Sequence, residues 1–221
     1  MDEAAESPET DVDANWVLST TFALAQAQKL AEAWAVMERY LARNPDLAPN
    51  VMVNALFTCR HGCRDAQRRG VLCDQILDEV VRRRAIAREV PVVENLAMLL
   101  NDLDRPSDAI AALREMRAAK AALRGKGAVA WSYAAWISKD PKELRDAVTI
   151  LAPVLDAEVD DPEEIPLAMQ NLAAVHLALG ERDQALAMAE RCLALDPRRR
   201  KDLLEDPDLA PLRGDPRFPK G

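Results

Sequence analysis

Three of the four cysteines lie close together around a histidine, as Cys59, His61, Cys63 and Cys73. Thiolate and imidazole groups are the usual zinc ligands, and exposed thiolates also respond to oxidants. The spacing matches neither the C-x2-C pairs of zinc sites nor the haem-attachment motif C-x-x-C-H. A free cysteine is commonly a small core residue, and Cys59 falls on a packing position of a predicted helix. Two interpretations therefore stay open, a metal- or redox-responsive site and core packing.

Side chains that perform acid–base or nucleophilic catalysis are few or fall on other duties. The chain has two histidines, His61 and His176, and His176 falls on the apolar stripe of a predicted helix. Acidic residues are abundant, but they fall on predicted helix exteriors and caps. No nucleophile elbow, phosphate-binding loop or paired zinc motif occurs. We therefore expect no enzyme activity and no cofactor.

The composition indicates that helices position these residues. Of 221 residues, 49% are apolar and 30% are charged, while only 7 are glycine and 4% are aromatic. Few glycines and many strong helix formers argue against a β-rich fold. The net charge of −8 gives no electrostatic footprint for a nucleic acid. The basic runs at 82–84 and 198–201 follow predicted helices, whose dipole favours cations at that end.

One pattern recurs along the chain with a period near 38 residues. Copies that begin at Val93 and Met169 align without gaps 76 residues apart, and another begins midway at Trp131. Earlier copies begin at Val17 and Met52, the second with a longer turn. In each, apolar residues at spacing 0, 3, 4 and 7 form one stripe of a helix, and a second helix follows around a small alanine. We therefore expect an all-α fold, an α-solenoid of about five antiparallel helix pairs at 14–47, 50–84, 90–123, 128–158 and 166–199.

The last unit resembles the tetratricopeptide repeat. The matching positions are Met169, Leu172, Ala173, His176, Gly180, Ala185, Ala189 and Pro197. The third unit departs from the pattern by carrying Asp104 where the turn glycine stands. Residues 202–221 resemble the closing segment of tetratricopeptide arrays in bacterial proteins, in which Asp206 caps a short helix and Leu209, Leu212 and Phe218 cover the last unit. The resemblance implies a helical array that binds proteins.

The ends of the chain give expectations about its surroundings. Residues 1–13 carry six acidic groups and no basic one, which predicts a disordered acidic tail. The acidic start differs from a signal peptide, and no run of about 18 apolar residues occurs. We therefore expect a cytoplasmic protein with reduced thiols and no membrane contact. The excess of arginine over lysine, 22 to 7, indicates a GC-rich bacterial genome.

One face of each first helix offers a candidate binding row. At the third position of the five units stand Ser19, Asn54, Asn95, Tyr133 and Asn171. Three positions further along stand Phe22, Phe57, Met98, Trp136 and Ala174. An amide can hold the N–H and C=O groups of an extended peptide, and apolar neighbours can take its side chains.

We therefore predict an adaptor that binds a peptide or partner-protein segment in the concave groove. The predicted binding residues are Asn54, Phe57, Asn95, Met98, Tyr133, Trp136 and Asn171. An alternative stays open, in which the apolar row is core and the amides bond local backbone. The charges beside the row are mixed, with Lys139 and Arg60 against Glu94, Asp102 and Asp140, which disfavours a C-terminal carboxylate as the ligand. The partner's identity, the oligomeric state and the process served do not follow from the sequence.

Overall fold

A computed structural model describes residues 14–44, 53, 71, 74, 89–119, 122–157 and 162–220. Every regular element in these ranges is a helix, and no strand occurs among them. The all-α prediction is therefore confirmed for the part of the chain that the structure describes. The chain divides into two units, Met1–Ala87 and Arg88–Gly221. Each is considered by itself.

The first unit contains one described helix pair, α1 (Ala14–Gln26) and α2 (Leu30–Arg43). The two helices pack against each other through buried Val17, Ala25, Ala33 and Met37. These residues lie on the predicted apolar stripes. The second predicted pair, at 50–84, falls outside the described residues except for positions 53, 71 and 74. So does the acidic segment 1–13.

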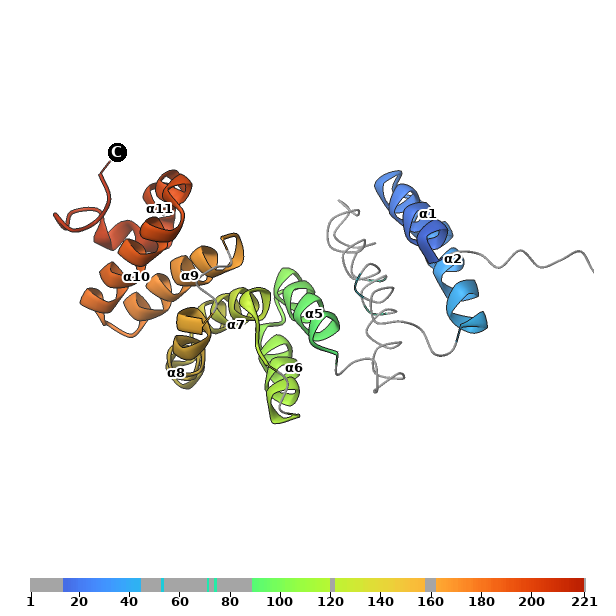
Figure 1. The fold of residues 1–221 in the computed structure, drawn as a ribbon, viewed down its shortest axis with the longest axis horizontal. Helices are drawn as coiled ribbons and strands as arrows, with labels where there is room; N and C mark the ends of the chain where they lie inside the picture. The colour runs from blue at the N-terminus through green and yellow to red at the C-terminus, as the bar shows by residue number, and fades with distance from the viewer. Residues whose placement is uncertain are drawn as a thin grey trace, which may run out of the picture. The chain divides into compact units, whose positions relative to one another are not determined.

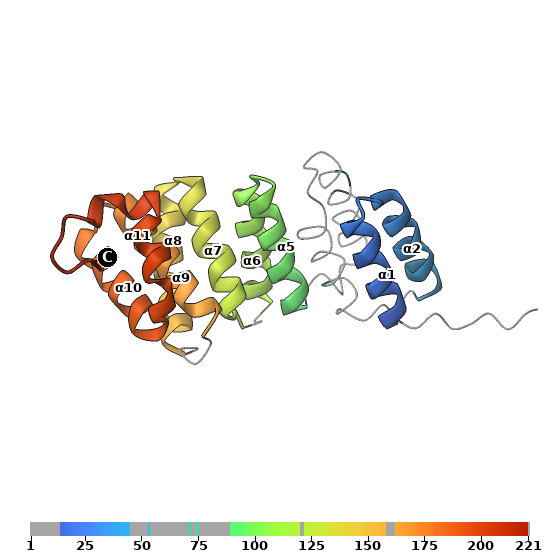
Figure 2. The ribbon, with the colours of Figure 1, turned by 90° about the horizontal axis from the view of Figure 1, so that it is seen from above.

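The second unit contains three consecutive helix pairs (Figure 1). They are α5 (Val90–Asp102) with α6 (Pro106–Ala118), α7 (Gly125–Ser138) with α8 (Pro141–Ala157), and α9 (Glu164–Ala178) with α10 (Arg182–Leu195). Within each pair the two helices pack together, and α7 also packs against both α5 and α9. The second helices α6 and α8 contact the first helix of the next pair, and Figure 2 shows the pairs following one another. Every layer therefore shares a core with its neighbour.

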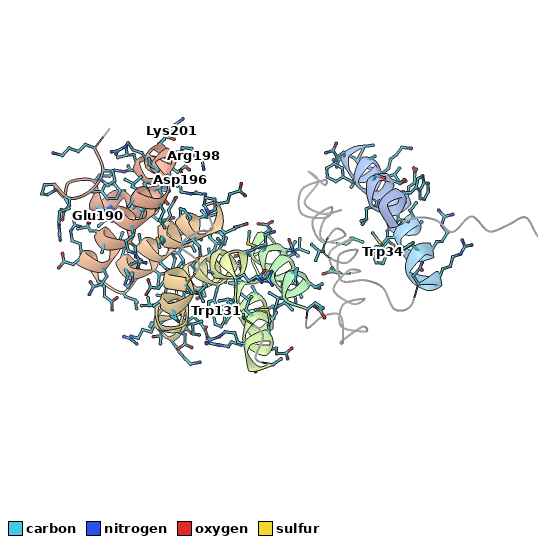
Figure 3. The ribbon with its side chains drawn as sticks, viewed as in Figure 1. Trp34, Trp131, Glu190, Asp196, Arg198 and Lys201 are labelled. Atoms are coloured by element: carbon cyan, nitrogen blue, oxygen red, sulfur yellow. The ribbon has the colours of Figure 1, made fainter. Side chains whose placement is uncertain are left out.

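Small alanines lie where the helices of a pair come closest. Ala109, Ala147 and Ala185 are fully buried, as the repeat predicts. A larger side chain at these positions would push the paired backbones apart. Trp131 of α7 is also fully buried, with the Arg117 guanidinium of α6 above its ring at 5.9 Å (Figure 3). The observed pairs agree with the predicted ranges to within a few residues.

The turn between paired helices has the same geometry in three units. Gln28, Asp104 and Gly180 occupy equivalent positions and all have a left-handed backbone, with φ of 61°, 58° and 78°. In each turn the next residue's N–H donates to a carbonyl five residues earlier: Lys29 to Leu24, Arg105 to Leu100, and Glu181 to His176, at 2.8–2.9 Å. This pattern is the Schellman motif, which satisfies the last carbonyls of a helix. The predicted turn at Gly180 is thus confirmed, and the other two units make it without glycine.

The chain after α10 folds back over the last pair. It forms η2 (Pro197–Arg199), α11 (Arg200–Glu205) and η3 (Pro207–Leu212), and η3 packs on α9. The Asp206 side chain accepts a hydrogen bond from the Asp208 N–H at 2.9 Å, which caps η3 as predicted. The predicted covering residues Leu209, Leu212 and Phe218 are all buried. The capping helix is of the 3-10 type, and Pro211 within it has no N–H to extend an α-helical ladder.

Candidate binding surface

Tyr133 and Trp136 form an aromatic pair on α7. They stand three residues apart, so their side chains meet on one face of the helix. The ring centroids are 5.8 Å apart and the planes are tilted by 31°. Tyr133 is 40% exposed, one of few large apolar side chains in the described ranges that are so open, and Trp136 is half-buried. Exposed aromatic side chains of this kind are enriched at protein interfaces.

Lys139 covers one face of this pair. It is the C-cap residue of α7 and has a left-handed backbone with φ of 54°. Its Nζ lies 3.6 Å from the centroid of the Trp136 ring, well within the range of a cation–π interaction. The left-handed conformation costs a non-glycine residue about 1 kcal/mol. The stacked ammonium offsets part of that cost and fixes the position of the indole.

Asp208 of η3 places a carboxylate near Lys139. Burial raises the pKa of Asp208 and the neighbouring Asp206 carboxylate raises it further, while the Lys139 ammonium acts in the opposite direction. Asp206 is already engaged, because one of its oxygens accepts from Asp208 N–H and the other from Gln170 Nε2 at 3.0 Å. The Asp208 carboxylate makes no hydrogen bond or ion pair with any residue of the described ranges. We call Tyr133, Trp136, Lys139 and Asp208 the α7 surface.

Two predicted amides are engaged in helix contacts. The Asn95 side chain is 8% exposed, and its Nδ2 donates to the Pro91 carbonyl of the same helix at 2.7 Å. The Asn171 Nδ2 donates from α9 to the Ser132 Oγ of α7 at 3.1 Å. These contacts correspond to the alternative in which the amides bond local groups. Asn95 and Asn171 therefore border the α7 surface as structural residues.

The rest of the predicted apolar row lies in different surroundings. Met98 is half-buried on α5, and Ala174 is buried on α9. Phe22 is half-buried on α1 of the first unit. Asn54 and Phe57 fall outside the described residues. Of the seven predicted binding residues, the structure thus brings only Tyr133 and Trp136 into an exposed cluster within its described part.

Glu94 lies at a position that the sequence assigned to ligand-facing charge, and the structure corrects this. Its carboxylate is 4% exposed and accepts the N–H groups of Arg124 at 3.1 Å and Gly127 at 3.2 Å, where α7 begins. Burial raises the pKa of Glu94, although these N–H donors act in the opposite direction. A Cβ on Gly127 would come within 2.7 Å of the carboxylate oxygen. Glu94 therefore joins α5 to the start of α7 and is not open to a ligand.

The same repeat position joins successive layers in the next two units. Ser132 of α7 accepts from Asn171 of α9, and Gln170 of α9 donates to Asp206 of the cap. Sequence analysis missed this role. The signal available was the polar character of Glu94, Ser132 and Gln170 one residue after the first packing position of each stripe.

The cysteine cluster Cys59, His61, Cys63 and Cys73 falls outside the described residues. The fourth cysteine, Cys192, is buried in α10, and burial raises the pKa of its thiol to about 11. His176 is buried too, with Nδ1 2.7 Å from the Glu181 carboxylate at the turn. Within the described ranges no group of three or more metal-binding side chains comes together.

The basic run at 198–201 is paired with acidic neighbours. Arg198 donates from its N–H at 3.1 Å and from Nε at 2.8 Å to the Asp196 carboxylate, and Arg199 lies 3.8 Å from the same group. Figure 3 shows Asp196, Arg198 and Lys201 at the junction of α10 and α11. Mutual hydrogen bonding lowers the pKa of Asp196 and raises that of Arg198. The run therefore closes the end of α10, as expected from its place after a second helix.

In the described part of the chain, no helix is both long enough and apolar enough to span a bilayer. Comparison with protein-family models, with curated proteins and with solved structures finds no match to this chain. The α7 surface therefore has to be interpreted from its own chemistry.

Proposed function

We propose that this protein is an adaptor that binds a segment of a partner protein at the α7 surface. The observation that carries the proposal is the exposed Tyr133–Trp136 pair, held under the Lys139 ammonium. No chemical step is assigned to the protein itself. The adjoining residues Met98, Asn95 and Asn171 border the contact, and Asn54 and Phe57 are further candidates from the second predicted pair.

The chemistry of the surface suits a peptide-like ligand. The two rings supply an apolar anchor, the Tyr133 hydroxyl can donate and accept a hydrogen bond, and the Lys139 ammonium can donate. Interface energy is concentrated in a few tyrosine, tryptophan and arginine side chains, each of which contributes 2 kcal/mol or more, an order of magnitude in affinity. A rigid pair of this kind loses little conformational entropy on binding, because each ring has only two side-chain torsions.

The fold proposed for this adaptor is a tetratricopeptide-like α-solenoid. The support comes from the three turns at Gln28, Asp104 and Gly180, which share one hydrogen-bond pattern, and from the packing of α5, α7 and α9 in succession. Helix pairs that recur with one geometry stack into a superhelix, and the inner face of that superhelix is where such arrays bind proteins.

Photo-crosslinking tests the proposal in the cell that makes the protein. The residue p-benzoylphenylalanine is placed at Tyr133 and, as a matched control, at Leu195, an exposed apolar side chain on α10. We expect a discrete adduct from position 133 that is absent from position 195. The same adduct must weaken when Trp136→Phe is added. Equal adducts from both positions, or none from position 133, would contradict the proposal.

A further inference from the structure

The α7 surface has an unequal charge balance. Asp206 and Asp208 together carry two negative charges, and Lys139 is the basic side chain whose charge acts on Asp208. Its ammonium lies on the Trp136 ring, and no ion pair joins it to Asp208. Asp208 is half-buried, so its carboxylate has given up part of its water without gaining a partner among the described residues. A further cation at this place would meet a favourable potential.

The aromatic pair accepts the same kind of group. A cation is attracted to the face of an indole or phenol ring, and Lys139 already makes this interaction within the chain. A guanidinium is planar, so it can stack on a ring while its N–H groups fork toward a carboxylate. The Asp208 carboxylate supplies an acceptor of that kind next to the rings.

We infer that the partner segment carries a basic residue, best an arginine, which stacks on the Tyr133–Trp136 pair and forms an ion pair with Asp208. The inference rests on the proposed function and specifies the ligand chemistry of the same surface. Lys139 then acts as a resident cation that the partner's arginine displaces or crowds. An acidic side chain pairing with Lys139 is the opposite possibility, and it is disfavoured by the two carboxylates.

Substitution of Lys139 separates these possibilities by the sign of its effect. The probes are two amidated and acetylated pentapeptides, Gly-Leu-Arg-Leu-Gly and Gly-Leu-Glu-Leu-Gly, titrated into the full-length chain. Binding is followed by the indole N–H signal of Trp136, assigned with Trp136→Phe. We expect the arginine peptide to bind about fivefold more weakly to Asp208→Asn and about threefold more tightly to Lys139→Gln, magnitudes typical of partly exposed ion pairs. Glu190→Gln, a carboxylate on the exposed side of α10, serves as the matched control and leaves both values unchanged.

Three results would overturn the inference: preferential binding of the glutamate peptide, weaker arginine-peptide binding in Lys139→Gln, or no perturbation of Trp136 by either peptide. The photo-crosslink from position 133 is independent of these probes. A specific adduct together with any of the three results would remove the basic ligand and leave the adaptor proposal standing, whereas loss of the adduct would remove the adaptor proposal itself.

Discussion

Replacing Glu94 by Gln or by Ala separates two effects of this side chain between α5 and α7. Its carboxylate accepts the N–H groups of Arg124 and Gly127, and it carries a charge in a buried position. Glutamine keeps an oxygen for both N–H groups but removes the charge. Alanine removes the acceptor as well, which leaves two N–H donors at the start of α7 without a partner.

The magnitudes follow from these contacts. Leaving a buried donor unsatisfied costs about 1–3 kcal/mol, so Glu94→Ala lowers the free energy of unfolding by about 2–3 kcal/mol. For Glu94→Gln the pH dependence matters more. Burial raises the pKa of Glu94 in the folded state, so the stability contributed by this carboxyl is complete below its ordinary pKa and is lost as the pH rises through the raised value. The glutamine variant therefore gains on the wild type between about pH 4 and about pH 7.

Urea unfolding followed by far-UV circular dichroism at several pH values measures both effects. We expect the stability difference between Glu94→Gln and the wild type to be small in acid and to shift in favour of the variant toward neutrality. A difference that shifts in favour of the wild type would mean that the two N–H donors stabilise the charge more than burial opposes it. That result would refute our account of Glu94.

Three further perturbations test the packing. Gly180→Ala lowers the free energy of unfolding by about 1 kcal/mol, because a Cβ there meets no atom within 4 Å and only the left-handed backbone is penalised; Asp104→Gly gains a similar amount at the equivalent turn, and a loss in urea unfolding would contradict the shared geometry. Gly127→Ala brings a Cβ within 2.7 Å of Glu94 Oε1 and of Leu123 Cδ1, so we expect a loss of about 1–3 kcal/mol, and an unchanged unfolding midpoint would show that α5 and α7 are less closely packed. Because Cys192 is buried and its pKa is raised to about 11, a disulfide reagent labels it only on unfolding, as located by mass spectrometry; prompt labelling of the folded protein would count against its burial.

The helices and their pairing follow closely from the sequence. Apolar spacing on one helix face is a local property, so the stripes that contain Val17, Trp131 and Met169 predict buried faces without knowledge of any neighbour. Ala109, Ala147 and Ala185 mark the closest approaches for the same reason, since only a small side chain lets two backbones come together. The capping role of Asp206 depends on residues next to it in the chain, and it too was predictable.

The parts that escaped prediction depend on residues far apart in the sequence. Glu94 reaches Arg124 and Gly127 some thirty residues later, and Asn171 reaches back to Ser132. A helical wheel shows that such residues share a face, but it does not show which neighbouring helix covers that face. The amides therefore looked available to a ligand, whereas the structure engages them within the fold. Tyr133 and Trp136 stayed exposed, and that difference between neighbours on one row is visible only in three dimensions.

The affinity of the captured partner for matched variants tests the adaptor proposal most directly. Once the partner from the position 133 crosslink is identified, its dissociation constant is measured with the wild type, Tyr133→Ala, Trp136→Ala and the control Leu195→Ala, each checked for unchanged helical content. We predict that either aromatic substitution weakens binding about 30-fold, as expected for a central aromatic contact, while Leu195→Ala changes it less than twofold. Equal affinities for all four proteins would place the partner elsewhere and contradict the proposed α7 surface.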